Sequence, residues 1–262
     1  MLTRVAGVLL VLAAAGPPVT ALKLGLPLWP LGRPLLISLV FGAVVWALRA
    51  ATSGGIAVGM LICFLLTQSP QIWTGFSALP IGRPALPALI AVFVISFAAT
   101  KFGRTKKEAR GLAEERRGRQ ASQIVANLGV AALFAAVGRY EGCTAALAEA
   151  AADTASSEIG QAIGGPVKLL TTWKTVPAGT DGGISITGTV AGIAAASITV
   201  AIGALHHALW PHAAVVFLSA CAGLLFDSLL GATVERRGWI GNDLVNFTST
   251  LFAALLATFL SS

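Results

Sequence analysis

The sequence predicts an all-α fold: a polytopic bundle of about nine transmembrane helices that forms one integral membrane domain over residues 1–262. Three observations support this prediction. Hydrophobic residues make up 56% of the chain and charged residues only 11%, whereas a soluble domain carries about 25% charged residues. The mean hydropathy is +0.82. Apolar runs approaching the length that crosses a bilayer, about 20 residues, follow one another along the whole chain.

These apolar runs define the predicted spans, beginning with the N-terminal spans of residues 1–100. In chain order they lie at about residues 5–22, 35–50, 55–67, 85–100, 121–138, 143–163, 187–209, 212–233 and 243–260. The first run, behind Arg4, also resembles a cleavable secretory signal, but the many later spans favour a retained helix. The run at residues 55–67 is short for a span, and the run at residues 143–163 is rich in Ala and contains acids. Either segment is therefore a candidate for a re-entrant helix.

Residues 101–120 form a basic loop that sets the predicted orientation. The segment carries eight Lys and Arg residues, and such an excess marks the cytoplasmic side of a membrane protein. Counting spans outward from it places the N-terminus and the loops at 164–186 and 234–242 on the cytoplasmic side, and the C-terminus outside. We interpret the basic residues from Lys101 to Arg110 as solvated topology signals that hold no ligand.

Polar residues recur at helical spacing in residues 121–262, near the cytoplasmic ends of the spans. One stripe, with the spacing i, i+4, i+7 and i+11, consists of Arg116, Gln120, Gln123 and Asn127. Hydrogen bonding between neighbouring helices explains Gln123 and Asn127 equally well. The last span begins with Asp243 and Asn246, behind Asn242, which fits an N-cap.

Acidic residues form two further stripes. Glu149 and Asp153 lie four residues apart in one span, and Asp227 and Glu235 flank Gly231 in another. An ionisable side chain in hydrocarbon costs on the order of 2.5–3.5 kcal/mol, and buried carboxylates are normally paired or hold a metal ion. We therefore interpret Asp153 and Asp227 as functional residues of a site where several helices converge.

The loop of residues 176–189, VPAGTDGGISITGT, has the composition of a phosphate-binding nest. It contains the glycines Gly179, Gly182, Gly183 and Gly188 and the hydroxyl residues Thr180, Ser185, Thr187 and Thr189. Glycines allow backbone N–H groups to approach an oxyanion, and the helix that follows offers its N-terminus. Lys174, just upstream, adds a cation. The loop matches neither common nucleotide-binding glycine motif, so an ordinary flexible loop is the alternative.

The three histidines, His206, His207 and His212, do not form a predicted metal site. Adjacent histidines on a helix point about 100° apart, and the span count places them on the side opposite the acids. We interpret them, with Trp210, as residues of the membrane interface.

Six motifs in the second half of the chain occur in the order of a known family. They read KEARGLAEERRGR, QIVANLG, ADTASSEIG, VPAGTDGGISITGT, DSLLGAT and NDLVNF. Together they resemble a widespread family of multi-pass membrane proteins, long of unknown function, that includes the phytyl-phosphate kinase of plants and cyanobacteria. The resemblance covers about residues 100–262. The chain is more distantly similar to the CTP-using polyprenol kinases and phosphatidate cytidylyltransferases, which share an Asp-containing motif and a Gly/Ser-rich loop.

The resemblance also implies site positions. The family's motif positions fall on Asp153, Ser157, Glu158, Lys174, Gly179, Thr180, Asp181, Gly182, Gly183, Ser185, Asp227, Ser228, Asn242, Asp243 and Asn246. Three residues depart from the pattern: Ala152 replaces a cysteine, Leu128 a glycine and Glu235 a glutamine. The last departure weakens the case for Glu235 as a ligand.

By this resemblance the chain is expected to be a kinase of the bacterial inner membrane. It would transfer a phosphoryl group from a nucleoside triphosphate, CTP being favoured, to an isoprenoid monophosphate. The expected partners are that lipid phosphate, the nucleotide and membrane lipids, with no nucleic acid. The tail length, the nucleotide base, the oligomeric state and the choice between an alcohol and a monophosphate acceptor stay open.

The expected cofactor is Mg²⁺, because a monophosphate acceptor is already ionised and phosphoryl transfer then depends on metal and positioning. The metal-ligand candidates are Asp153 and Asp227, which lead, with Glu158 and Asp243. Glu158 lies five residues after Asp153, so it shares that face only if the helix ends near Ser157. Glu149 is the alternative on helical geometry alone.

The remaining candidates would bind phosphate. The residues expected to act on the transferred phosphate are Lys174, Arg116, Arg119 and Asp181. The residues expected to bind the nucleotide or phosphate are Gly179, Thr180, Gly182, Gly183, Ser185, Ser157, Asn127 and Asn246. Cations and backbone N–H groups are the protein groups that stabilise phosphoryl oxygens.

A transporter or lipid flippase is the alternative from another functional class. Asp153 and Asp227 would then be proton or cation sites, and the glycines would be hinges. Transporter sites tend to lie near the bilayer midplane, whereas the polar stripes here end on one side. That asymmetry favours an enzyme that uses a cytosolic nucleotide.

Overall fold

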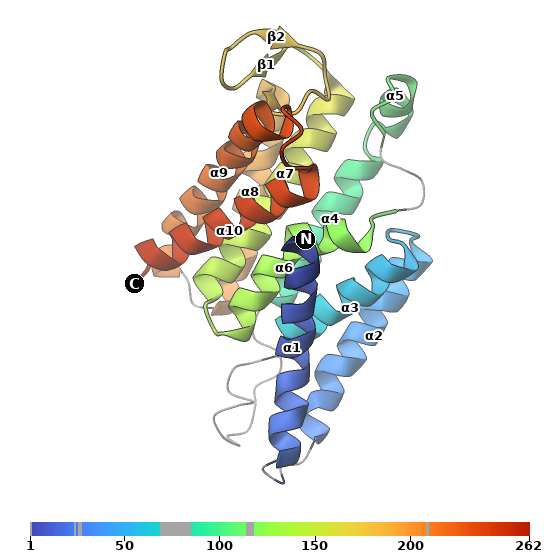
Figure 1. Ribbon diagram of the computed structural model, residues 1–262, viewed down its shortest axis with the longest axis vertical. Helices are drawn as coiled ribbons and strands as arrows, with labels where there is room; N and C mark the ends of the chain where they lie inside the picture. The colour runs from blue at the N-terminus through green and yellow to red at the C-terminus, as the bar shows by residue number, and fades with distance from the viewer. Residues whose placement is uncertain (1, 24, 26–27, 69–84, 114–117, 208–209) are drawn as a thin grey trace.

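The computed structural model describes residues 2–23, 25, 28–68, 85–113, 118–207 and 210–262, which form a helical bundle with one small sheet (Figure 1). The helices are α1 (Leu2–Lys23), α2 (Gly32–Ala47), α3 (Ser53–Thr67), α4 (Leu86–Lys101), α5 (Arg104–Ala109), α6 (Ala121–Ala136), α7 (Tyr140–Ile163), α8 (Ile186–His207), α9 (Ala213–Leu230) and α10 (Asn242–Leu260). Short 3-10 helices precede α2 (Trp29–Leu31) and α9 (Trp210–His212), and a π-helical turn, Gly231–Glu235, extends α9. The predicted all-α membrane bundle is confirmed.

The sheet lies in the loop between α7 and α8. Its strands are β1 (Val167–Leu169), β2 (Thr175–Val176) and β3 (Gly183–Ile184), in the antiparallel order β2-β1-β3. Val167 pairs with Val176 on one side, and Lys168 pairs with Ile184 on the other. Residues 177–182 of the glycine-rich loop are thereby fixed at both ends, because β2 and β3 bracket them on the same central strand.

Five of the described helices, α1, α2, α8, α9 and α10, are long and apolar enough to cross a membrane. Helices α3, α4 and α6 are apolar but have only 15 or 16 residues. The remaining long helix, α7, has 24 residues and carries the acids. The total of nine spans and the cytoplasmic N-terminus therefore stay predictions.

Helix α7 is the centre of the bundle. It contacts α4, α6, α8, α9 and α10, and sixteen of its 24 residues are buried. Protein therefore surrounds it, which is how polar residues are tolerated at membrane depth. A helix of this length extends about 36 Å, against a hydrocarbon core of about 30 Å. The helix is continuous over this length, and the choice between a full span and a re-entrant helix for residues 143–163 stays a prediction.

Small residues allow α8 to lie close against α7. A Cβ atom built on Gly188 would lie 2.6 Å from the carbonyl oxygen of Ser156, and one on Gly192 would lie 2.9 Å from that of Ala152. Small residues at such contacts let two backbones approach, which is the usual means of association between membrane helices. The contact places the start of α8 beside the polar half of α7.

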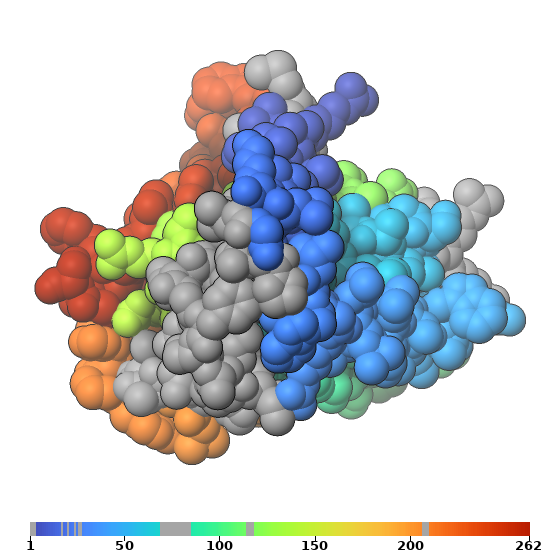
Figure 2. All heavy atoms as spheres, turned by 90° about the horizontal axis from the view of Figure 1, so that it is seen from below, coloured from blue at the N-terminus to red at the C-terminus, as the bar shows by residue number. Residues whose placement is uncertain are grey.

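The loops that the alternation of spans predicted to share one side do gather at one end of the bundle. Helix α5 and the sheet both lie at that end, opposite the C-terminal end of α1 (Figure 1). The α9–α10 connection joins them, since a Cβ atom on Gly182 would collide with the backbone of Ala232. Figure 2 views the opposite end, where α1 and α2 appear in blue and the C-terminal part of α8 in orange.

A buried ion pair holds α5 against α7. Lys107 is only 1% exposed, and its Nζ forms an ion pair with Glu158 of α7. The same ammonium donates to the carbonyl oxygens of Ala99 and Thr100, at 3.2 and 3.0 Å. The interpretation of the basic residues as solvated topology signals is therefore wrong for Lys107, because a helical turn inside the predicted loop buries it.

The shared end gives a topology test. In a variant without Cys63, Cys143 and Cys221, single cysteines at Lys106, Thr175 and Arg237 should react with membrane-impermeant thiol reagents from the cytoplasmic side only. A cysteine at Arg139, before α7, should react from the other side. If cysteines at Lys106 and Thr175 react from opposite sides, either α6 or α7 does not cross the membrane, and the shared end is wrong.

The ion pair gives a stability test. Lys107→Met leaves the Glu158 carboxylate buried without its cation, which typically costs about 3–5 kcal/mol. We expect a marked fall in the unfolding temperature of the protein in detergent micelles. Adding Glu158→Gln should recover part of the loss, while Lys106→Met, at an exposed neighbour, should change little. Equal unfolding temperatures for the Lys107 and Lys106 variants would contradict the role of the pair.

Candidate functional site

A polar cavity of about 320 Å³ opens where α6, α7, α9 and α10 meet the glycine-rich loop. The predicted site residues that line it are Arg119, Asn127, Asp153, Ser157, Glu158, Gly179, Thr180, Asp181, Gly182, Gly183, Ser185, Asp227 and Asn246. Its volume lies in the range of about 300–1,000 Å³ that is typical of small-molecule sites. The fold thus brings most of the sequence candidates into one cavity.

Two carboxylates line this cavity from different helices. Asp153 lies on α7 and Asp227 on α9. The Ser249 hydroxyl of α10 donates a hydrogen bond of 3.1 Å to Asp227 Oδ2. Arg119 offsets part of the negative charge at Asp153. These two side chains remain partly exposed to the cavity and available to a ligand.

A third acid, Glu149, lies one turn before Asp153 but does not line the cavity. It is 1% exposed, and its Oε1 atom has no hydrogen-bond partner within the described residues. Helix α9 covers it closely, since a Cβ atom on Gly223 would lie 2.7 Å from Glu149 Cγ. Glu149, the alternative metal ligand suggested by helical spacing alone, therefore lies beneath the site and does not line it.

The donor set of the cavity fits Mg²⁺ together with a phosphate ligand. Among the described residues, no group of three or more His, Cys, Asp or Glu side chains is arranged to hold a metal ion. Mg²⁺ is usually held by one or two carboxylates, with waters and substrate phosphates completing its shell. Asp153 and Asp227 supply that number of carboxylates.

Arg119 is fixed by contacts on both sides. Its Nη2 donates to Thr154 Oγ1 at 3.2 Å, which brings the guanidinium to α7. Its backbone N–H donates to the Ala50 carbonyl at 3.0 Å, and its carbonyl accepts from the Thr52 N–H at 3.1 Å. The turn between α2 and α3 therefore positions a cation of the polar cavity.

The two predicted asparagines bond to each other. Asn246 Nδ2 of α10 donates to Asn127 Oδ1 of α6 at 3.2 Å, and Asn127 Nδ2 donates to the Gln123 carbonyl at 2.8 Å. Gln123 accepts a hydrogen bond from the N–H of Gln120 as part of a capping box. Hydrogen bonding between helices, the alternative for these residues, is thus present, and both asparagines also line the cavity.

The glycine-rich loop curls over the cavity. Gly179 and Gly182 have φ values of +83° and +70°, a region that favours glycine. Within the loop, the N–H of Gly183 donates to the Thr180 carbonyl at 2.9 Å. Ser185 Oγ accepts a hydrogen bond of 3.1 Å from the N–H of Gly188, in the first turn of α8. The loop therefore leads into a helix N-terminus, as predicted.

Four candidates stand apart from this arrangement. Glu158 lines the cavity, but α7 continues past it to Ile163, and its carboxylate is bonded by Lys107 and Thr100. Lys174 is exposed beside the β2 strand, and Asp243 lies in the first turn of α10; neither lines the cavity. Arg116 lies outside the described residues.

Several lining residues were not among the leading candidates. They are Gln123, Thr154, Ser156, Gln161, Ser228, Glu235 and Asn242. Helical spacing groups Gln123 with Asn127 and Glu235 with Asp227. It also points to Gln161, which lies one turn after Ser157 and whose Nε2 donates to Ser157 Oγ at 3.1 Å. Glu235 lines the cavity from the π-helical turn that extends α9.

Comparison with known proteins agrees with this architecture. The family model described as integral membrane protein DUF92 matches residues 36–254. Protein VTE6, chloroplastic, of Arabidopsis thaliana is 30% identical over 255 residues, covering 91% of this chain and 70% of the relative. An uncharacterized membrane protein of Synechocystis is 32% identical over 183 residues, covering 64% of this chain and 70% of the relative. An uncharacterized membrane protein of Methanocaldococcus jannaschii is 31% identical over 184 residues, covering 67% of this chain and 75% of the relative.

No solved structure matches the chain. The family match includes both cavity acids, the glycine-rich loop and the turn that holds Arg119. The chain therefore belongs to the DUF92 family of integral membrane proteins.

Proposed function

We propose that this protein is a membrane-embedded isoprenoid-phosphate kinase, resembling phytyl-phosphate kinase, that uses a nucleoside triphosphate. One observation carries the proposal: Asp153, Asp227, Arg119 and the glycine-rich loop, far apart in sequence, line one polar cavity at one end of the bundle. Carboxylates, a guanidinium and a glycine-rich loop at a helix N-terminus are groups that can stabilise phosphoryl transfer. The resemblance in the sequence motifs and the 30% identity to VTE6 support the same assignment.

In this proposal each part of the cavity has a role. Asp153 and Asp227 would hold Mg²⁺, which when bound offsets the charge of the nucleotide phosphates. The loop from Gly179 to Ser185 would cradle those phosphates with its N–H groups. Arg119 would orient the acceptor phosphate and offset the charge that develops during transfer. We favour CTP as the nucleotide because of the distant similarity to CTP-using enzymes.

The reaction itself needs little acid–base chemistry. An oxygen of the ionised acceptor monophosphate attacks the terminal phosphorus of the nucleotide, and the bond between that phosphorus and the bridging oxygen breaks. The products are an isoprenoid diphosphate and a nucleoside diphosphate. No proton has to be removed from an acceptor that is already ionised, so positioning and charge account for the catalysis.

The first functional test removes the two cavity acids. Asp153→Asn and Asp227→Asn should each lower nucleotide-dependent phosphorylation of geranylgeranyl phosphate about 100-fold or more, because losing a metal ligand removes several kcal/mol of stabilisation. The matched control is Glu141→Gln, at the opposite end of α7 and outside the cavity. Near-normal rates in either Asp variant, at saturating Mg²⁺ and with an unchanged unfolding temperature, would remove that residue from the site.

The second test separates an enzyme from a transporter. An enzyme working at one membrane face needs no second compartment, so purified protein in micelles should convert phytyl or geranylgeranyl phosphate to the diphosphate. The conversion should consume a nucleoside triphosphate, stop on chelation of Mg²⁺ and resume when Mg²⁺ is restored. Absence of turnover in micelles, combined with lipid flux in proteoliposomes that Asp153→Asn abolishes, would establish the transporter instead.

A further inference from the structure

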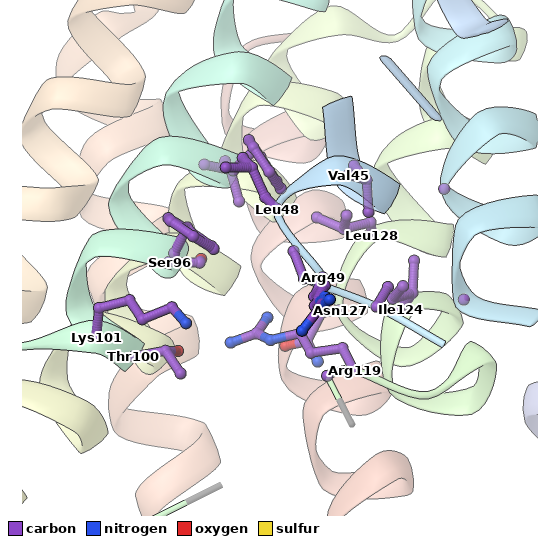
Figure 3. Close-up of a pocket in the computed structure, with 18 of the residues that line it drawn as sticks. Val45, Leu48, Arg49, Ser96, Thr100, Lys101, Arg119, Ile124, Asn127 and Leu128 are labelled. Carbon is purple, nitrogen blue, oxygen red and sulfur yellow. The ribbon is translucent and has the colours of Figure 1, made fainter. Parts of the chain in front are cut away.

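A second, larger cavity of about 580 Å³ lies between α2, α3, α4 and α6 (Figure 3). We call it the tail pocket. Its walls are mostly apolar: Val45 comes from α2, Leu48 directly follows α2, and Leu128 comes from α6. Aromatic side chains line the pocket along α4. The ring of Phe93 packs edge-on against Phe41, with 5.5 Å between the ring centroids, and stacks on Phe97, with 6.0 Å between the centroids. A cavity of this size and lining suits an apolar chain.

Cations gather at one end of the tail pocket. Figure 3 shows Lys101 and Thr100 on one side and Arg49 and Arg119 on the other, with the apolar residues Val45, Leu48 and Leu128 farther along the pocket. Among the described residues, no carboxylate lies within salt-bridge distance of Arg49 or Lys101. Lys101 Nζ instead lies 5.3 Å from the centroid of the Phe97 ring. Glu108 also lines the pocket, but its carboxylate pairs with Arg104 at 3.0 Å. This end of the pocket is therefore suited to an anion.

A buried hydroxyl also faces the pocket without a partner. Ser96 is 8% exposed and lines the cavity one helical turn before Thr100. Its Oγ atom has no hydrogen-bond partner within the described residues. A buried polar atom left unpaired costs about 1–3 kcal/mol, so a ligand oxygen that accepts from Ser96 would recover that cost.

Arg49 is held in an uncommon conformation. Its φ of 51° lies in the left-handed region, which is unfavourable for a residue with a side chain and tends to occur at functional sites. Two of the three residues that follow it, Ala50 and Thr52, make the backbone hydrogen bonds that hold Arg119. The same turn therefore positions both arginines at the charged end of the tail pocket.

The two cavities meet at this charged end. Arg119 and Asn127 line both the tail pocket and the polar cavity. A ligand anion beside Arg119 would thus lie next to the cavity that contains Asp153 and Asp227. An apolar chain with one terminal anion fits this arrangement, whereas a free phosphate would leave the apolar walls without a partner.

We propose that the tail pocket binds the acceptor lipid, with its isoprenoid chain between α2, α3, α4 and α6 and its monophosphate at Arg49, Lys101 and Arg119. The identity of the acceptor rests on the proposed kinase function, while the pocket and its charged end do not. The N-terminal half would thereby supply the lipid site, and the C-terminal half the nucleotide site.

The charged end is tested by two substitutions. Arg49→Asn and Lys101→Gln should each raise the KM for geranylgeranyl phosphate at least about tenfold, as expected for the loss of one charge-assisted contact, and leave the KM for the nucleotide unchanged. Asn tolerates a positive φ, so the first variant removes the charge without new backbone strain. Lys106→Gln, exposed and outside the pocket, is the matched control. Unchanged KM values in both variants would overturn the assignment of the phosphate position.

The apolar part is tested by filling it. A Cβ atom on Gly59 would meet only Phe41 Cε1, at 3.7 Å, so Gly59→Leu should extend into the pocket without a backbone clash. We expect it to shift the preference from geranylgeranyl phosphate toward the shorter geranyl phosphate. The matched control, Ala57→Leu, lies on the exposed face of the same helix and should keep the original preference. Identical preferences in the two variants would place the chain elsewhere.

A binding experiment without nucleotide separates this inference from the proposed function. A photoreactive analogue of geranylgeranyl phosphate should crosslink to α2, α3, α4 or α6, with geranylgeranyl phosphate competing and with inorganic phosphate or phosphatidic acid competing poorly. Such crosslinking in a protein that lacks kinase activity would support the lipid site and contradict the kinase. Crosslinks confined to other helices, or equal competition by phosphatidic acid, would overturn the lipid site even if kinase activity is present.

Discussion

The cost of placing charge in hydrocarbon governs this structure. Helix α7 carries Glu149, Asp153 and Glu158 over less than three turns, and in contact with lipid each would be expensive. The bundle meets this constraint by surrounding α7 with five other helices. It also gives Glu158 the ammonium of Lys107 and leaves Asp153 facing a polar cavity. The other long helices can then be largely apolar, with Asp227 of α9 as the main exception.

The same constraint explains what could be predicted from the sequence. Apolar runs reveal helices directly, so the all-α bundle followed from composition and periodicity. Asp153 and Asp227 were identifiable because acids in apolar runs are conspicuous, and their convergence with the glycine-rich loop followed from the alternation of spans. The coordinates of a helical bundle do not show which of its ends faces the cytoplasm, so the orientation in the membrane stays a prediction from the basic loop.

Other features depend on contacts that spacing does not encode. Lys107 belongs to a run of basic residues, and its burial depends on a short helix that docks near Glu158, 51 residues away. Arg49 and Lys101 lie at the ends of ordinary apolar spans, so nothing in their local pattern indicates a shared pocket. Tertiary packing determines each of these placements.

The central position of α7 has a consequence for how the protein is made. A chain enters the membrane from its N-terminus, so α7 is synthesised after α1, α4 and α6 but before α8, α9 and α10. Three of the helices that cover its polar side are thus absent when it first emerges. Its acids must remain in a hydrated or chaperoned setting until the last three helices arrive. Biogenesis of the site is therefore completed only with the C-terminal third of the chain.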